Sequence, residues 1–142
     1  ICSEFKLLEP QLKRLAERKW SLLRTASPNR GFVTSDAPVV VGWNDPSKVP
    51  PFLKNSPGFG VKGTFVYFPL NPNLALFGEY EAEPSCNEVD CAYVSRLNSL
   101  LIQDAHDFIY HSGNGFQFMV NGEHILEGSQ LLEELSMIES VR

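Results

Sequence analysis

Hydrophobic side chains recur with helical spacing in three parts of the chain. Between residues 10 and 26, and again between residues 85 and 105, apolar positions fall three or four residues apart, as on the buried face of a helix. Pro10 suits the first position of the first helix, and Ser85 with Glu88 is typical of a capping box for the second. Ser129 is expected to cap a third, C-terminal helix.

β-Branched and aromatic runs predict strands between these helices. Residues 32–33 and 39–41 are two such runs on either side of a short polar step. Residues 64–68 and 74–80 flank a turn rich in proline and asparagine, which predicts an antiparallel hairpin. Residues 108–111 form one more extended run, and Asn121-Gly122 predicts a second hairpin near the C-terminus. The proline- and glycine-rich residues 44–63 are expected to form a long irregular loop.

Together these elements predict the α+β class. A mostly antiparallel sheet from residues 31–43, 64–80 and 107–111 would pack against the two main helices, followed by a C-terminal hairpin and helix. A chain of 142 residues fits a single domain spanning residues 1–142. Because the sequence opens at Ile1 and not at a methionine, we expect this domain to be the C-terminal part of a longer protein.

Charge and composition narrow the classes of function. A net charge of −5 disfavours a protein that binds nucleic acid by neutralising phosphates. No apolar run approaches the roughly 18 residues that a membrane span needs, and no signal-peptide pattern opens the sequence. Three cysteines and no Asn-x-Ser/Thr acceptor suit a reducing compartment. The sequence therefore predicts a cytoplasmic protein with free thiols at Cys2, Cys86 and Cys91, and no contact with nucleic acid or membrane.

The cysteines and histidines resemble a zinc site only in their order along the chain. Cys86 and Cys91 are followed by His106 and His111, which is a two-cysteine, two-histidine pattern. If the residues between them are helical, Cys91 and His106 lie about 22 Å apart at 1.5 Å per residue. We therefore expect no metal ion and no other cofactor.

The polar step at Ser35 and Asp36 is the candidate site for chemistry. An aspartate at the end of a buried strand could act as a base, hold a metal ion or orient a histidine. Ser35 lacks the Gly-x-Ser-x-Gly elbow of the α/β-hydrolases. The structural alternative is that both side chains only cap the turn before Pro38. Asn98, on the apolar stripe of the second helix, is expected to be buried and hydrogen-bonded to residues 34–37.

Four motifs in this order resemble an uncharacterised, mainly bacterial family, the domain of unknown function numbered 4238. They are residues 32–40 (FVTSDAPVV), 68–72 (FPLNP), 96–98 (RLN) and 105–112 (AHDFIYHS). The resemblance covers roughly residues 20–112 and implies the C-terminal half of that family. Asn71 stands where the family usually has serine, and Ala37 where it often has asparagine. The family's N-terminal part, with its own histidine, glutamate and arginine motifs, has no counterpart here.

Two classes of function remain open at this point. The first is an interaction or scaffold domain of a larger cytoplasmic bacterial protein, which binds an unidentified protein partner or the upstream region of its own chain. The second is part of a hydrolase-like enzyme, with Asp36 and Ser35 in catalysis, Thr34 and Asn98 in binding, and the site completed by residues upstream. The sequence predicts neither the partner nor the oligomeric state.

Overall fold

The protein is built on a five-stranded sheet. In the computed structural model, which describes residues 2–27, 30–55, 57–113 and 115–140, the strand order is β3-β4-β5-β1-β6. The first four strands run antiparallel to their neighbours, and β6 is parallel to β1. The bounds of these strands are β1 (Lys19–Thr25), β3 (Val40–Trp43), β4 (Thr64–Asn71), β5 (Leu74–Glu79) and β6 (Cys86–Val89). The α+β class and the mostly antiparallel sheet are therefore confirmed, but the strand predicted within residues 107–111 is not part of this sheet.

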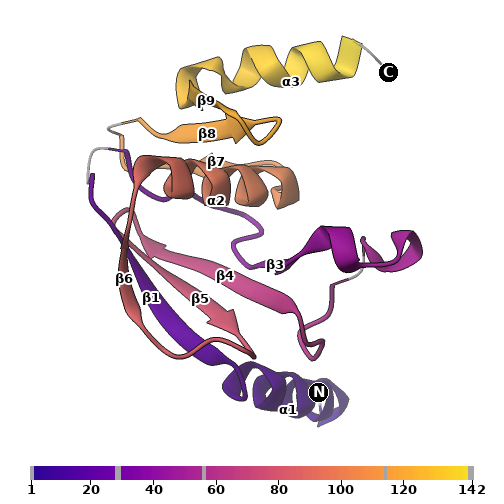
Figure 1. The fold of residues 1–142 in the computed structure, drawn as a ribbon. Helices are drawn as coiled ribbons and strands as arrows, with labels where there is room; N and C mark the ends of the chain where they lie inside the picture. The colour runs from indigo at the N-terminus through magenta and orange to yellow at the C-terminus, as the bar shows by residue number, and fades with distance from the viewer. Residues whose placement is uncertain (1, 28–29, 56, 114, 141–142) are drawn as a thin grey trace.

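Three helices and two short ribbons complete the fold. The helices are α1 (Cys2–Ala16), α2 (Cys91–Asp104) and α3 (Leu131–Ser140). One ribbon pairs β2 (Thr34–Ser35) with β7 (Ile109–Tyr110), and the other pairs β8 (Gln117–Val120) with β9 (His124–Glu127). Single 3-10 turns lie at η2 (Pro46–Lys48), η3 (Pro51–Leu53) and η4 (Gly128–Gln130). Figure 1 shows the layers in order: the sheet, α2 across it, the β8–β9 hairpin above α2, and α3 on top.

The hydrophobic core lies between the sheet and α2 and continues to the hairpin. Val94, Leu97 and Leu101 of α2 are buried, and the sheet meets them with residues that include Tyr67 and Ala75. Phe116 and Phe118 belong to the same buried cluster, which also takes in Phe32 and Val33 before β2. The hairpin after residue 114 is therefore part of the core and not an appendage.

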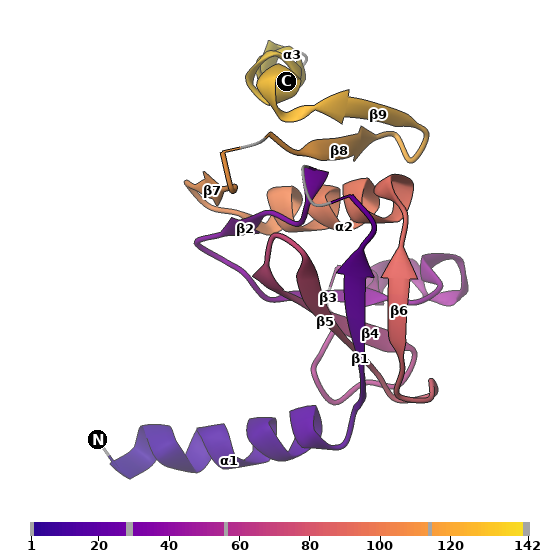
Figure 2. The ribbon, with the colours of Figure 1, turned by 90° about the vertical axis from the view of Figure 1, so that its left-hand side faces the viewer.

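The predicted helix over residues 10–26 is wrong at both ends: it begins at Cys2, so Pro10 lies inside it and not at its first position, and its second half is not helical. Helix α1 ends at Ala16, and β1 begins at Lys19 as an interior strand paired with β5 and β6. Strand β1 is paired on both edges, and the backbone hydrogen bonds of these ladders outweigh the helical spacing of Trp20 and Leu23. Leu12, predicted to face the core, is 61% exposed. Helix α1 projects from one end of the sheet and does not cover its face, contrary to the prediction (Figure 2).

The start of the second helix was also predicted too early. Cys86–Val89 extends to pair with β1, and α2 begins at Cys91 with Asp90 as its N-cap, whose carboxylate accepts the N–H of Tyr93 at 2.8 Å. Ser85 caps no helix, and its hydroxyl bonds the Ser21 hydroxyl at 3.0 Å. The residues before Asp90 form an edge strand that runs parallel to β1. Their sequence does not alternate between apolar and polar residues, so it did not indicate a strand.

The C-terminal hairpin is where it was predicted. Asn121 and Gly122 both have positive φ, 54° and 72°, as a type I′ turn between β8 and β9 requires. The helix that follows does not start at Ser129. It is preceded by η4, where the Gln130 side chain accepts the N–H of Glu127 at 3.1 Å.

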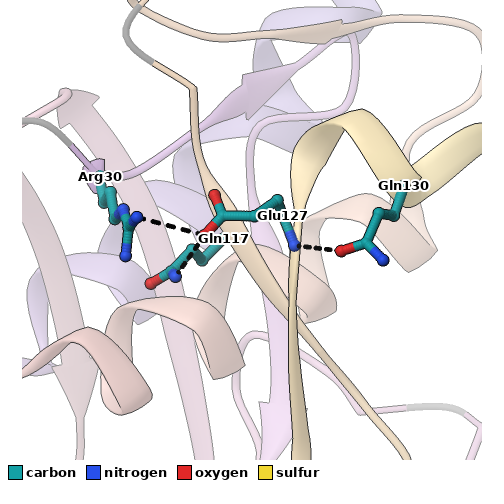
Figure 3. A network of polar contacts seen from close by, with 4 residues as sticks. All are labelled: Arg30, Gln117, Glu127 and Gln130. Atoms are coloured by element: carbon teal, nitrogen blue, oxygen red, sulfur yellow. Dashed lines mark hydrogen bonds and ion pairs between the residues drawn. The ribbon is translucent and has the colours of Figure 1, made fainter.

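A small polar network fastens this hairpin to the chain before β2. Figure 3 shows Glu127 of β9 with Arg30 and Gln117 on one side and Gln130 on the other. One carboxylate oxygen of Glu127 is 3.4 Å from the Arg30 guanidinium and accepts the Gln117 amide at 2.9 Å. The Arg30–Glu127 pair is half exposed, so it positions the hairpin more than it stabilises it.

Arg18 ties the junction of α1 and β1 to the end of the sheet. The side chain is buried, and its two terminal nitrogens donate to the carbonyls of Thr64, Gly78 and Phe59 and to the Thr64 hydroxyl, at 2.8–3.1 Å. The guanidinium lies 4.5 Å from the centre of the Tyr80 ring. Burial lowers the pKa of Arg18, while Tyr80 and the nearby carboxylates of Glu81 and Glu79 oppose that shift. Backbone carbonyls, and not carboxylates, are thus the main hydrogen-bond partners of this cation among the described residues.

We predict that Arg18→Lys destabilises the fold by about 2 kcal/mol, because an ammonium cannot reach three separate carbonyls with the geometry of a planar guanidinium. Urea unfolding followed by circular dichroism measures the change. Arg24→Lys on the exposed side of β1 is the matched control and should change stability by less than about 0.5 kcal/mol. Equal effects of the two substitutions would contradict the role given to Arg18.

Candidate functional site

An open groove of about 280 Å³ lies where three distant parts of the chain meet. They are the residues leading into β2, the turn between β4 and β5, and the end of β7 with the residues after it. The lining residues are Phe32, Val33, Thr34, Pro69, Leu70, Asn71, Pro72, Tyr110, His111 and Ser112. All of them come from motifs that the sequence analysis singled out, although only Thr34 was named there as a binding residue.

Backbone hydrogen bonds hold the three segments together. The N–H of Phe32 donates to the carbonyl of Pro72 at 2.9 Å, which fixes the first segment to the β4–β5 turn. Gly31 makes this approach possible, since a Cβ at that position would lie 1.9 Å from the same Pro72 oxygen. The β2–β7 ribbon adds the third segment by pairing Thr34 with Tyr110. The groove is therefore set by the backbone of the fold.

The lining is largely apolar and carries hydroxyl and imidazole groups at its edge. Leu70 and Tyr110 are 47% and 53% exposed, so two large side chains are open to a partner. The Nδ1 atom of His111 accepts the N–H of Gly113 at 3.1 Å. In the neutral ring the proton therefore sits on Nε2, which donates to no other residue in the described part of the chain. Groups of this kind bind uncharged ligands by apolar contact and a few hydrogen bonds.

Ser35 and Asp36 lie next to the groove but do not line it. The Ser35 side chain is buried, and its hydroxyl accepts the N–H of Ala37 at 3.1 Å, two residues on. Asp36 is exposed, and its two carboxylate oxygens accept the N–H groups of His106 and Asp107 at 3.0 and 2.8 Å. Both side chains thus bind backbone atoms around the β2–β7 ribbon.

These hydrogen bonds favour the ionised form of Asp36. The N–H of Asp107 makes the largest contribution and lowers the pKa of the Asp36 carboxyl below its usual range. Partial desolvation opposes this shift, and the N–H of His106 adds to it. Asp36 is therefore a carboxylate at neutral pH. Its two oxygens pair the backbone N–H groups of residues 106 and 107.

Asn98 is fully buried, as predicted, but its hydrogen bonds are not to residues 34–37. Its carbonyl oxygen accepts the N–H of Val33 at 3.0 Å, and its amide donates to the carbonyls of Gly31 at 3.1 Å and Gln117 at 2.9 Å. The expected contact with Asp36 is therefore wrong. The amide instead pairs backbone groups before β2 and in β8.

The cysteines and histidines stay apart in the structure. Cys86 and Cys91 are free thiols, as predicted, and the side chain of Cys2 lies outside the described residues. Within the described ranges, no three His, Cys, Asp or Glu side chains gather into a group that could hold a metal ion. Among the helices that the structure describes, none is long and apolar enough to cross a membrane.

Comparison with known proteins agrees with the motifs. Residues 3–114 match the family model of a protein of unknown function (DUF4238), which extends the resemblance found by sequence to the start of α1. The match includes every residue of the groove and stops before the β8–β9 hairpin. No curated protein and no solved structure matches the chain.

We predict that Asn98→Leu destabilises the protein by about 3 kcal/mol, because Val33, Gly31 and Gln117 each keep a buried backbone group without a partner. Chemical denaturation measures the loss. Asn55→Leu, at an exposed loop position, is the control and should stay within about 0.5 kcal/mol of the wild type. A loss below about 1 kcal/mol for Asn98→Leu would show that the amide is not needed there.

Asp36 should make the stability depend on pH in the acid range. Because its folded-state pKa is lowered, its contribution is complete above the unfolded value of about 3.9 and is lost as the pH falls through the folded value. Asp36→Asn should therefore lower the melting temperature at pH 7, and the difference from wild type should shrink below about pH 4. Thermal unfolding at both pH values tests this. An equal difference in melting temperature at the two pH values would show that the charge of Asp36 does not stabilise the fold.

Proposed function

The chain belongs to the DUF4238 family, and we propose that its groove makes it an interaction domain that binds an extended, uncharged segment of a partner protein. The single observation that carries the proposal is the meeting of residues 32–34, 69–72 and 110–112 in one open groove. Segments this far apart in sequence build a binding surface only through the fold.

The chemistry of the lining supports an uncharged, partly apolar partner. The groove contains no lysine, arginine or carboxylate, so a charged segment would gain no ion pair there. Leu70 and Tyr110 offer exposed contact area, and tyrosine is among the side chains most enriched at interfaces. Thr34, Ser112 and the Nε2 atom of His111 could then bond the carbonyls of an extended peptide.

The hydrolase hypothesis, with Asp36 and Ser35 in catalysis, stays a prediction. To act as a base, Asp36 would have to release one of the two N–H groups that its oxygens accept. The residues that would complete such a site lie upstream in this hypothesis. Binding of a partner in the groove requires no such release, because Asp36 does not line the groove. The cytoplasmic location and the origin in a larger bacterial protein are likewise proposed.

The groove can be tested with peptides selected from a display library against the whole chain. We expect selected peptides to be uncharged at their centre and to lose about tenfold or more in affinity on Tyr110→Ala and on Leu70→Ala. Fluorescence polarisation measures the affinities. Phe52→Ala, at an 81% exposed aromatic outside the groove, is the matched control and should leave binding unchanged. Peptides that are insensitive to both groove variants would refute the assignment.

A further inference from the structure

A second hollow, of about 340 Å³, lies between the sheet and α2 and shares no lining residue with the groove. Phe65 of β4 and Phe77 of β5 line it from the sheet, and Leu97 of α2 lines it from the helix. The two phenylalanine rings are stacked, with centroids 4.9 Å apart and planes 17° from parallel. These residues give the hollow an apolar, aromatic surface.

The aromatic surface depends on a glycine in the neighbouring strand. Gly42 of β3 pairs with Phe65, and a Cβ at this position would lie 2.3 Å from the tip of the Phe65 ring. A larger residue would displace the ring and close or reshape the hollow. Gly42 does not line the hollow itself but leaves the space that the Phe65 ring occupies.

Opposite charges stand at the edge of this hollow. Glu79 lies at the end of β5 beside the aromatic pair, and Arg96 and Tyr93 lie on α2 across from it. Burial raises the pKa of the Tyr93 phenol, the Glu79 carboxylate raises it further, and the Arg96 guanidinium lowers it. Both charges therefore act on the same hydroxyl. In the part of the chain that the structure describes, neither Glu79 nor Arg96 takes part in an ion pair.

We infer that this hollow binds a free α-amino acid with a large apolar side chain. Arg96 is suited to the carboxylate, which guanidinium groups bind in a bidentate manner. Glu79 is suited to the ammonium group, and the stacked rings of Phe65 and Phe77 to the side chain. A volume of about 340 Å³ falls at the small end of the range for small-molecule sites, as expected for a single amino acid. The site goes beyond the interaction role proposed for the groove and does not depend on it.

The test uses L-phenylalanine and two analogues that each lack one charge. Isothermal titration and amide chemical shifts of the whole chain should show saturable binding of L-phenylalanine with a dissociation constant of about 1 mM or below. N-Acetylphenylalanine lacks the ammonium group and phenylalaninamide lacks the carboxylate, so each should bind about tenfold more weakly. The shifted resonances should include Phe77 and Leu97.

Two variants assign the charges to their partners. Arg96→Gln should weaken the binding of L-phenylalanine about tenfold and leave the affinity for phenylalaninamide unchanged. Glu79→Gln should weaken the binding of L-phenylalanine about tenfold and leave the affinity for N-acetylphenylalanine unchanged. Arg24→Gln and Glu88→Gln alter an opposite-charge pair of facing positions elsewhere in the sheet and should have no effect. Thermal unfolding checks that all four variants fold.

The inference is overturned if L-phenylalanine gives no saturation up to about 10 mM, ten times the expected constant. It is also overturned if neither Arg96→Gln nor Glu79→Gln changes the affinity for L-phenylalanine, or if the shifted resonances lie at the groove around Tyr110. The first two results leave peptide binding in the groove unaffected, so the two proposals can fail separately.

Discussion

One buried amide, that of Asn98, holds three parts of the molecule in register. Through it, α2 is bonded to the backbone before β2 on one side and to β8 on the other. A buried backbone group without a partner costs about 1–3 kcal/mol, so these contacts leave little freedom in how the three parts are arranged. The groove depends on this arrangement, since Phe32 and Val33, which the amide positions, form one of its walls.

Polar side chains in this fold, both buried and exposed, bind the backbone more than one another. Arg18 binds carbonyls of the sheet and the loop before it, Asp36 binds the N–H groups of residues 106–107, and the Ser99 hydroxyl contacts the backbone of Met119. The short ribbons and irregular segments leave many main-chain groups outside regular ladders, and these must be paired. This is why Asn98 and Asp36, both expected to be hydrogen-bonded, do not meet.

The sequence predicted the elements whose pattern is local and missed those that depend on distant partners. The β4–β5 and β8–β9 hairpins are set by their own turns, so Pro72 and Asn121-Gly122 were enough to find them. Strand β1 has helical spacing in isolation and is extended only because β5 and β6 lie on either side. The groove could not be located from sequence, because its three segments come together only in the folded chain. The motifs that contain these segments are recognisable in the sequence one by one.

The end of the family match at residue 114 has a consequence for how such domains diverge. In this chain α2 is covered on its outer side by β8, whose backbone meets Asn98 and Ser99. A relative with a different tail must still supply donors and acceptors at those points, either from another strand edge or from ordered water. The extent of the family match and the extent of the cooperatively packed core therefore do not coincide in this chain. Any other tail in place of the hairpin would have to satisfy the same polar groups of the helix beneath it.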